Sequence, residues 1–151
     1  MVQYIGIDPG MGGGIAFIDS DDNSFAFNCP PNPREMSYLL KDMLMDNVEH
    51  ECIIEHVHAF PHDGRSSVFK FGRNLGQWEG VLCSLEVSYI TVTPYVWQKY
   101  YGTPKFEEKA KRKRWLKALA SEKFPQIKTT FKVSDAVLIA NYLKETSNAK
   151  S

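Results

Sequence analysis

The chain has 151 residues, a length that suits one domain with a hydrophobic core, and we expect a single domain over residues 1–151. Its 43% hydrophobic and 13% aromatic residues are typical of a globular protein and exclude a disordered one. Because no run of about 18 apolar residues and no basic-then-apolar leader occurs, we expect neither a membrane span nor a secretory signal. The three scattered cysteines, Cys29, Cys52 and Cys83, indicate reduced thiols and a cytoplasmic protein.

Charge is distributed unevenly along the chain, although 18 Lys and Arg residues balance 18 Asp and Glu residues. Acidic side chains gather at 19–22 and 42–55, whereas residues 105–117 carry seven cations and two glutamates. Such a segment is typical of a surface that binds nucleic-acid phosphates, and its alternative is an ordinary solvated helix face. The cations that we expect to contact nucleic acid here are Lys105, Lys109, Lys111, Arg112, Lys113 and Arg114.

The first part of the chain predicts three short strands and a helix. The strands, at 2–7, 14–19 and 24–28, are joined by tight turns as an antiparallel meander. A proline-rich break follows, and apolar residues then recur at helical spacing over 34–47. The apolar positions of this helix are Met36, Leu39, Leu40, Met43 and Leu44.

The second part alternates strands with helices. We expect a strand at 51–55, a long helix at about 65–87, a strand at 89–93 and a short helix that starts at Pro94. A basic amphipathic helix at 106–123 carries Ala110, Trp115, Leu116 and Leu119 on its apolar side, and a final helix spans 134–144. This order predicts an α/β fold with a mixed five-stranded sheet flanked by helices on both faces.

Three acidic residues occupy related places in this pattern. Asp8 and Glu55 each end an apolar strand, and Asp135 opens the final helix. If the two strands are neighbours, both side chains lie at the sheet edge where α/β proteins bind ligands. Three unpaired carboxylates there would repel one another, and a divalent cation such as Mg²⁺ or Mn²⁺ removes this penalty. The alternatives are a turn-capping Asp8, a lysine-paired Glu55 and an Asp135 stabilised by the helix dipole.

These segments resemble the motifs of a known nuclease family. Gly6-Ile7-Asp8-Pro9-Gly10, Ile53-Ile54-Glu55 and Ser134-Asp135-Ala136 are similar, in order and spacing, to those of the RuvC-type Holliday junction resolvases of the RNase H-like superfamily. The segments 67–80 and 93–99 are similar to those of small phage-encoded members. The resemblance covers almost the whole chain.

The resemblance implies an RNase H-like fold and a metal-dependent endodeoxyribonuclease that resolves Holliday junctions and other branched DNA. It implies that Asp8, Glu55 and Asp135 hold two Mg²⁺ ions, with Mn²⁺ as a substitute, and that water attacks the phosphodiester. It also implies a homodimer and a place in the cytoplasm, that of a bacterial host if the protein is phage-encoded. No nucleotide cofactor is expected, because 151 residues hold only one lobe of an actin-like ATP binder.

One position departs from the family pattern. The residue one helical turn before the last aspartate is usually acidic or histidine, and here it is Lys132. Either three carboxylates suffice, or another residue supplies the fourth ligand, or Lys132 instead contacts phosphate or acts near the leaving group. Two further functions therefore stay open: a nuclease of RNA or RNA–DNA hybrids, and a branched-DNA-binding protein that does not cut.

The segment after Glu55 contains histidines and an aromatic residue. His56, His58 and His62 have spacing that zinc sites use, but no cysteine lies nearby in the sequence. By the resemblance, a ring near this place stacks on an unpaired base, and either His58 or Phe60 supplies it. The alternative is an ordinary surface loop.

The long helix carries glycines at every fourth position. Gly72, Gly76 and Gly80 line one face, where either the sheet of the same chain or a second copy packs closely. Lys70 and Arg73 lie beside this row and are placed to contact phosphates or solvent.

Overall fold

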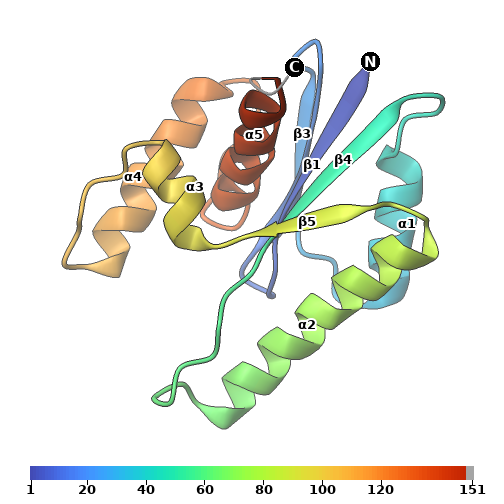
Figure 1. Ribbon diagram of the computed structural model, residues 1–151. Helices are drawn as coiled ribbons and strands as arrows, with labels where there is room; N and C mark the ends of the chain where they lie inside the picture. The colour runs from blue at the N-terminus through green and yellow to red at the C-terminus, as the bar shows by residue number, and fades with distance from the viewer. Residues whose placement is uncertain (149–151) are drawn as a thin grey trace.

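A single five-stranded sheet organises the protein, for which the computed structural model describes residues 1–148 (Figure 1). The strand order is β3-β2-β1-β4-β5. The strands are β1 (Val2–Asp8), β2 (Gly14–Asp19), β3 (Ser24–Asn28), β4 (Glu49–Glu55) and β5 (Tyr89–Val92). The helices are α1 (Pro33–Met43), α2 (Arg65–Ser84), α3 (Pro94–Tyr100), α4 (Lys109–Lys123) and α5 (Ser134–Asn148).

The sheet is mixed, as predicted. The strands β1, β2 and β3 pair antiparallel through short turns, whereas β1 pairs with β4 and β4 with β5 in parallel. In the β1–β4 pair, Gly6 lies opposite Ile53 and Ile7 opposite Ile54. The carboxyl ends of these two strands therefore meet at one edge of the sheet.

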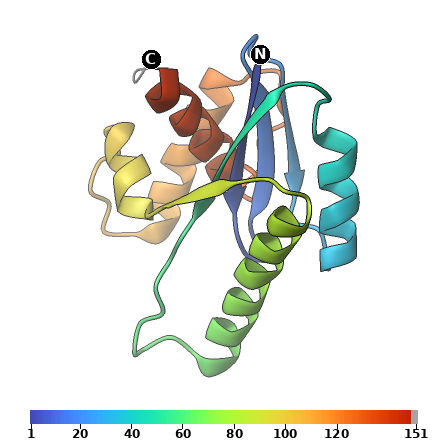
Figure 2. The same ribbon diagram turned by 45° about the vertical axis from the view of Figure 1, so that its right-hand side comes forward.

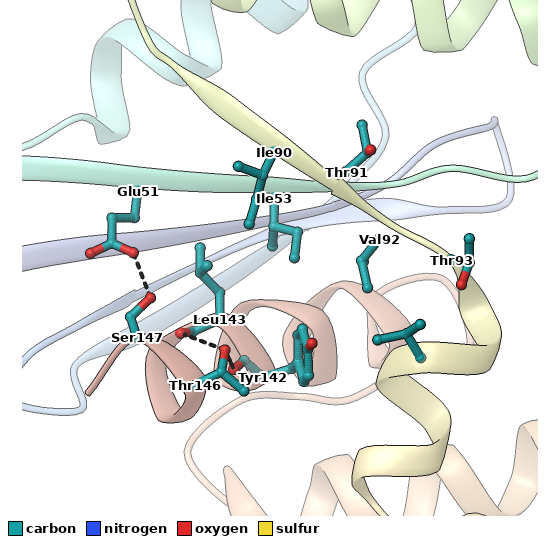
Figure 3. A pocket seen from close by; sticks show the side chains of 11 residues that line it. Glu51, Ile53, Ile90, Thr91, Val92, Thr93, Tyr142, Leu143, Thr146 and Ser147 are labelled. Atoms are coloured by element: carbon teal, nitrogen blue, oxygen red, sulfur yellow. Dashed lines mark hydrogen bonds between the residues drawn. The ribbon is translucent and has the colours of Figure 1, made fainter. Parts of the chain in front are cut away.

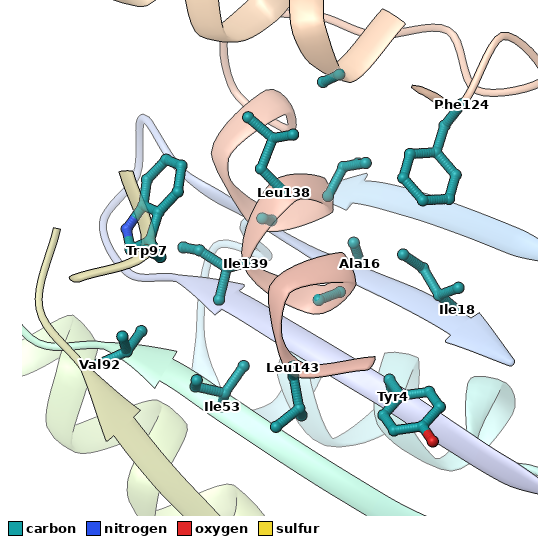
Figure 4. Packing of buried hydrophobic residues seen from close by; sticks show 14 of the residues in the cluster. Tyr4, Ala16, Ile18, Ile53, Val92, Trp97, Phe124, Leu138, Ile139 and Leu143 are labelled. Carbon is teal, nitrogen blue, oxygen red and sulfur yellow. The ribbon is translucent and has the colours of Figure 1, made fainter. Parts of the chain in front are cut away.

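Helices cover both faces of the sheet, which gives two separate hydrophobic cores (Figure 2). Side chains alternate along each strand, so Tyr4 and Ile53 point to one face while Ile5 and Ile54 point to the other. The first face packs against α5, with α3 and α4 outside it (Figure 4). The second face packs against α1 and α2 through side chains that include Trp78. The predicted α/β fold with helices on both faces is confirmed.

Gly6 brings α5 unusually close to the central strand. A Cβ at this position would lie 2.4 Å from the backbone nitrogen of Ala140 and 2.5 Å from the carbonyl oxygen of Ala136. Both contacts are far below van der Waals distance, and backbone atoms do not yield easily. The glycine of the first motif is thus required by packing, and it sets the distance between Asp8 on β1 and the start of α5.

Several predicted boundaries shift by a few residues. Helix α1 ends at Met43 because Leu44 is extended, and α2 ends at Ser84, shortly before Glu86 takes a positive φ of 59°. Helix α4 begins at Lys109 instead of residue 106, while α5 runs on to Asn148. The apolar side predicted for α4 is wrong at Ala110, which is exposed in the first turn.

The glycine row of α2 faces away from the sheet. A Cβ at Gly72, Gly76 or Gly80 would meet nothing within 4 Å, and all three residues are exposed. The opposite side of the helix, with Trp78 and Leu82, packs on the sheet. Close packing of this row against the sheet of the same chain is therefore wrong. A separate observation concerns membranes: within residues 1–148, no helix has the length and apolar character needed to span a bilayer.

We predict that Gly6→Ala destabilises the fold by about 3 kcal/mol, because the added methyl group forces β1 and α5 apart. Gly12→Ala is the matched control, since a Cβ at Gly12 meets nothing within 4 Å. Urea unfolding measures both changes. A Gly6→Ala protein as stable as the Gly12→Ala control would contradict this account of the packing.

Candidate active site

Three carboxylates from three elements converge at the carboxyl end of the β1–β4 pair. Because Ile7 lies opposite Ile54, the next residues, Asp8 and Glu55, occupy equivalent positions. Alternation turns both side chains toward the face that α5 covers, and Asp135 lies in the first turn of that helix. Each of the other two carboxylates acts electrostatically on Asp8. The predicted convergence is thus present in the structure.

Burial and mutual repulsion keep these groups from ionising easily. Burial, followed by the negative charges of Glu55 and then Asp135, raises the pKa of Asp8 well above its usual range. Burial also raises the pKa of Glu55 to about 7 and that of Asp135 to about 6. Asp8 and Glu55 lie close enough to act on one another, and the charge of Glu55 disfavours ionisation of Asp8. Neutralising one of these charges would therefore relieve part of the repulsion when no cation is bound.

A tight turn and one helix residue fix the backbone after Asp8. Gly10 has a φ of 108°, and its N–H donates to Asn74 Oδ1 of α2 at 2.7 Å. A Cβ at Gly13 would lie 2.0 Å from the carbonyl oxygen of Asp8, so this turn accepts only glycine there. Asn74 is buried, and its Nδ2 also donates to Cys29 Sγ at 3.3 Å.

Sequence reasoning did not identify Asn74 as a residue of the site. A signal was present: Asn74 precedes Trp78 and Leu82 at intervals of four, so a polar side chain stands in the buried row of α2. A buried amide needs hydrogen-bond partners. The spacing of this buried row did not show which groups elsewhere in the chain would be the partners of Asn74.

Glu55 has a partner from α3. Trp97 Nε1 donates to Glu55 Oε2 at 2.6 Å, and this hydrogen bond lowers the pKa of Glu55 against the larger effect of burial. The Trp97 indole is fully buried. The hydrogen bond was not predicted, because the two residues lie 42 positions apart.

Helix α4 brings positive charge to the carboxylates. Lys113, and to a lesser degree Arg112, lower the pKa of Asp135, and Arg112 does the same for Glu55. These charges come from α4 and not from Lys132, whose side chain is exposed in the turn before α5. A catalytic role for Lys132 stays a prediction.

Two hollows flank the site, and several of the residues predicted to contact nucleic acid line them. One, of about 610 Å³, lies between the segment after β4 and the first half of α2, and both His58 and Lys109 line it. The other, of about 860 Å³, lies between α3 and the start of α4, where Lys105 and Arg112 are joined by Tyr95 and Lys99. Tyr95 is 71% exposed, and Lys99 Nζ lies 5.6 Å from the centre of its ring.

The remaining predicted contacts lie on open surface. Phe60 stacks on His62 with ring centroids 5.7 Å apart, while Lys70 and Arg73 are exposed on α2. Arg114 is exposed on α4, as is Lys111, which lies 3.9 Å from a Glu108 carboxylate oxygen.

A third hollow, between β5 and α5, has a different character (Figure 3). Its volume is about 730 Å³, and apolar and hydroxyl side chains line most of it. Glu51 is the carboxylate on its wall, and it accepts a hydrogen bond from Ser147 Oγ at 2.6 Å. The converging carboxylates do not line this hollow, so we do not assign the chemistry to it.

Comparison with solved structures identifies the fold. The structure of Thermus thermophilus RuvC in complex with Holliday junction substrate matches with a TM-score of 0.68 and 12% sequence identity, covering 100% of this chain and 98% of that chain. The chain has the RuvC fold. A second structure of Thermus thermophilus RuvC matches with a TM-score of 0.60 and 13% identity over 96% of each chain. No family model and no curated protein sequence matches the chain.

The donor set of this RuvC fold fits a hard divalent cation. Asp8, Glu55 and Asp135 offer oxygen atoms only, they are largely buried, and their repulsion is what a cation would relieve. Within residues 1–148, no three His, Cys, Asp or Glu side chains are already spaced as a closed metal site. This finding counts against a zinc site of His56, His58 and His62.

We predict that Asp8→Asn stabilises the protein at pH 8 in EDTA. A carboxyl group with a raised folded-state pKa contributes stability below its ordinary pKa near 4, and this stability is lost as the pH rises through the folded values of about 6 and about 7. The wild type should therefore lose thermal stability between pH 5 and pH 8, and Asp8→Asn should lose less.

Thermal unfolding of both proteins at four pH values measures this difference. Asp46→Asn, a change at an exposed residue, is the control and should follow the wild type. An Asp8→Asn protein that is less stable than wild type at every pH would mean that the charge of Asp8 supports the fold.

Proposed function

We propose that this protein is a metal-dependent endonuclease that cuts branched DNA, with the Holliday junction as its main substrate. The observation that carries the proposal is the convergence of Asp8, Glu55 and Asp135 at the carboxyl end of β1 and β4. This convergence occurs in the fold of RuvC, and one solved RuvC structure contains a Holliday junction. The fold alone would leave the activity open, so the acidic site supplies the chemical argument.

In this proposal the three carboxylates hold the catalytic cations. Asp8 is central, because both Glu55 and Asp135 act on it, and it would bridge two ions. A bound pair of Mg²⁺ ions supplies Lewis acidity that activates water and stabilises the leaving oxygen of the phosphodiester. A cation would compete with protons for the oxygens of Asp8 and Glu55, whose pKa values are raised.

The cations of α4 would hold the DNA backbone beside this centre. Arg112 and Lys113 lie close enough to the carboxylates to affect their pKa values, so they are placed to meet the same phosphate. Lys109 and His58 line one flanking hollow, and Lys105 lines the other. Contacts of this kind bind phosphates without reading sequence, which suits recognition of a branched shape.

A second copy of the chain would complete the enzyme, because resolving a four-way junction requires two strands to be cut. The exposed glycine row of α2 offers a face on which another helix could approach closely. Lys70 and Arg73 lie beside this row, where a dimer would place them along the DNA. The proposed protein is therefore a homodimer with two identical sites.

We predict paired nicks in a synthetic four-way junction in Mg²⁺ or Mn²⁺ and none in EDTA. Asp8→Asn should lower the nicking rate by at least about 10³-fold, because metal binding loses its central ligand, while junction binding persists. Gel assays with linear duplex and RNA–DNA hybrid in parallel measure selectivity. Preference for the hybrid would favour an RNA-directed nuclease, and tight junction binding without nicking would favour a binding protein.

We predict that Gly76→Arg abolishes dimer formation, because the long side chain prevents close approach along α2. Sedimentation equilibrium of wild type and variant measures the oligomeric state. Ser67→Arg, which changes an exposed residue on the opposite side of the same helix from Gly76, is the control. A wild-type protein that stays monomeric at high concentration and on the junction would contradict the dimer.

A further inference from the structure

The indole of Trp97 joins the acidic site to the core in a way that packing alone does not require. Trp97 is fully buried in the cluster between the sheet and α5, where an indole N–H needs an acceptor. Its acceptor is Glu55 Oε2 at 2.6 Å, a charge-assisted hydrogen bond when Glu55 is ionised. The apolar ring sits in the core, and its one polar atom points at a candidate metal ligand.

A second tryptophan shows that burial does not dictate this contact. Trp78 is equally buried on the other face of the sheet, and it lies beside the Cys29 thiol, a weak acceptor. Its N–H makes no hydrogen bond of ordinary geometry among the described residues. The fold thus tolerates the Trp78 indole N–H without a good acceptor, whereas the Trp97 indole N–H donates to a carboxylate of the site.

The Trp97 ring is itself held from α5. Its edge meets Tyr101, with ring centroids 6.4 Å apart at 78°. The Tyr101 hydroxyl donates to the carbonyl oxygen of Leu138 at 2.6 Å and accepts from Asn141 Nδ2 at 2.9 Å. Trp97 therefore links Glu55 on β4 to the helix that carries Asp135.

We infer that Trp97 is a positioning residue that prepares Glu55 for a divalent cation. The indole binds Oε2 and so restricts the orientation of the Glu55 carboxyl group, whose other oxygen, Oε1, is left for a cation. Without this bond the Glu55 side chain regains its torsional freedom, and each cation that binds must order the side chain again. This inference rests on the proposed function, since it assigns Glu55 to the metal.

The test measures metal affinity directly, by calorimetric titration with Mn²⁺ in the absence of DNA. Trp97→Phe keeps an aromatic ring and removes the N–H, and we expect the Mn²⁺ dissociation constant to rise at least about tenfold, as for other residues that orient metal ligands. Trp78→Phe is the matched control, because it removes an equally buried indole that has no carboxylate partner, and it should stay within about twofold of wild type.

A second variant separates the hydrogen bond from the shape of the ring. Benzothienylalanine at position 97 replaces the N–H by sulfur and keeps the bicyclic form, so it should weaken Mn²⁺ binding as Trp97→Phe does. The half-saturating Mg²⁺ concentration for nicking should rise in parallel, while the junction dissociation constant in EDTA stays within about twofold.

The outcomes distinguish this inference from the proposed function. Wild-type Mn²⁺ affinity in both position-97 variants overturns the role of Trp97 and leaves the nuclease proposal standing. Loss of Mn²⁺ affinity in these variants, together with a wild type that never nicks DNA, supports the role of Trp97 and overturns the nuclease. A wild type that binds no Mn²⁺ overturns the inference.

Discussion

Electrostatic repulsion among three carboxylates, of which Glu55 is buried and Asp8 and Asp135 are partly buried, is the constraint around which this structure is arranged. Asp8 and Glu55 meet because β1 and β4 pair in parallel and in register, and Asp135 joins them because Gly6 lets α5 lie close to β1. Each contact that brings the groups together also increases the free energy needed to ionise them. Where ionising the carboxylates requires much free energy without a cation, a cation that relieves the repulsion binds strongly, provided that the fold holds the ligands in place.

Three helices hold the three carboxylates in place. Asn74 of α2 fixes the turn that follows Asp8, Trp97 of α3 binds Glu55, and Arg112 and Lys113 of α4 place positive charge near Asp135. These helices lie on both faces of the sheet (Figure 2), so the site is supported through the sheet as well as around it. Its geometry is a property of the whole domain and not of the three motifs alone.

The fold and the convergence of the three carboxylates could be predicted from the sequence because their signals are local. Apolar alternation and helical spacing marked the elements, and strands that end on Asp8 and Glu55 marked the edge of the sheet. The supporting contacts could not be predicted, since Asn74 and Trp97 meet partners 64 and 42 residues away and no short pattern encodes such a pairing. Of the two expectations for the glycine row, packing against the sheet of the same chain was wrong, because equal spacing does not show whether a helix face is buried or exposed.

The polarised charge of this chain has a consequence for how it meets a polyanion. A molecule whose formal charges sum to zero experiences no monopole attraction, so the field of a nucleic acid acts chiefly on its dipole. The torque on such a dipole would turn the molecule, and it would orient the exposed cations of α4 toward the strand. The protein would thus begin to be oriented once it comes within a Debye length of the nucleic acid, about 8 Å at physiological salt, before any side chain contacts a phosphate.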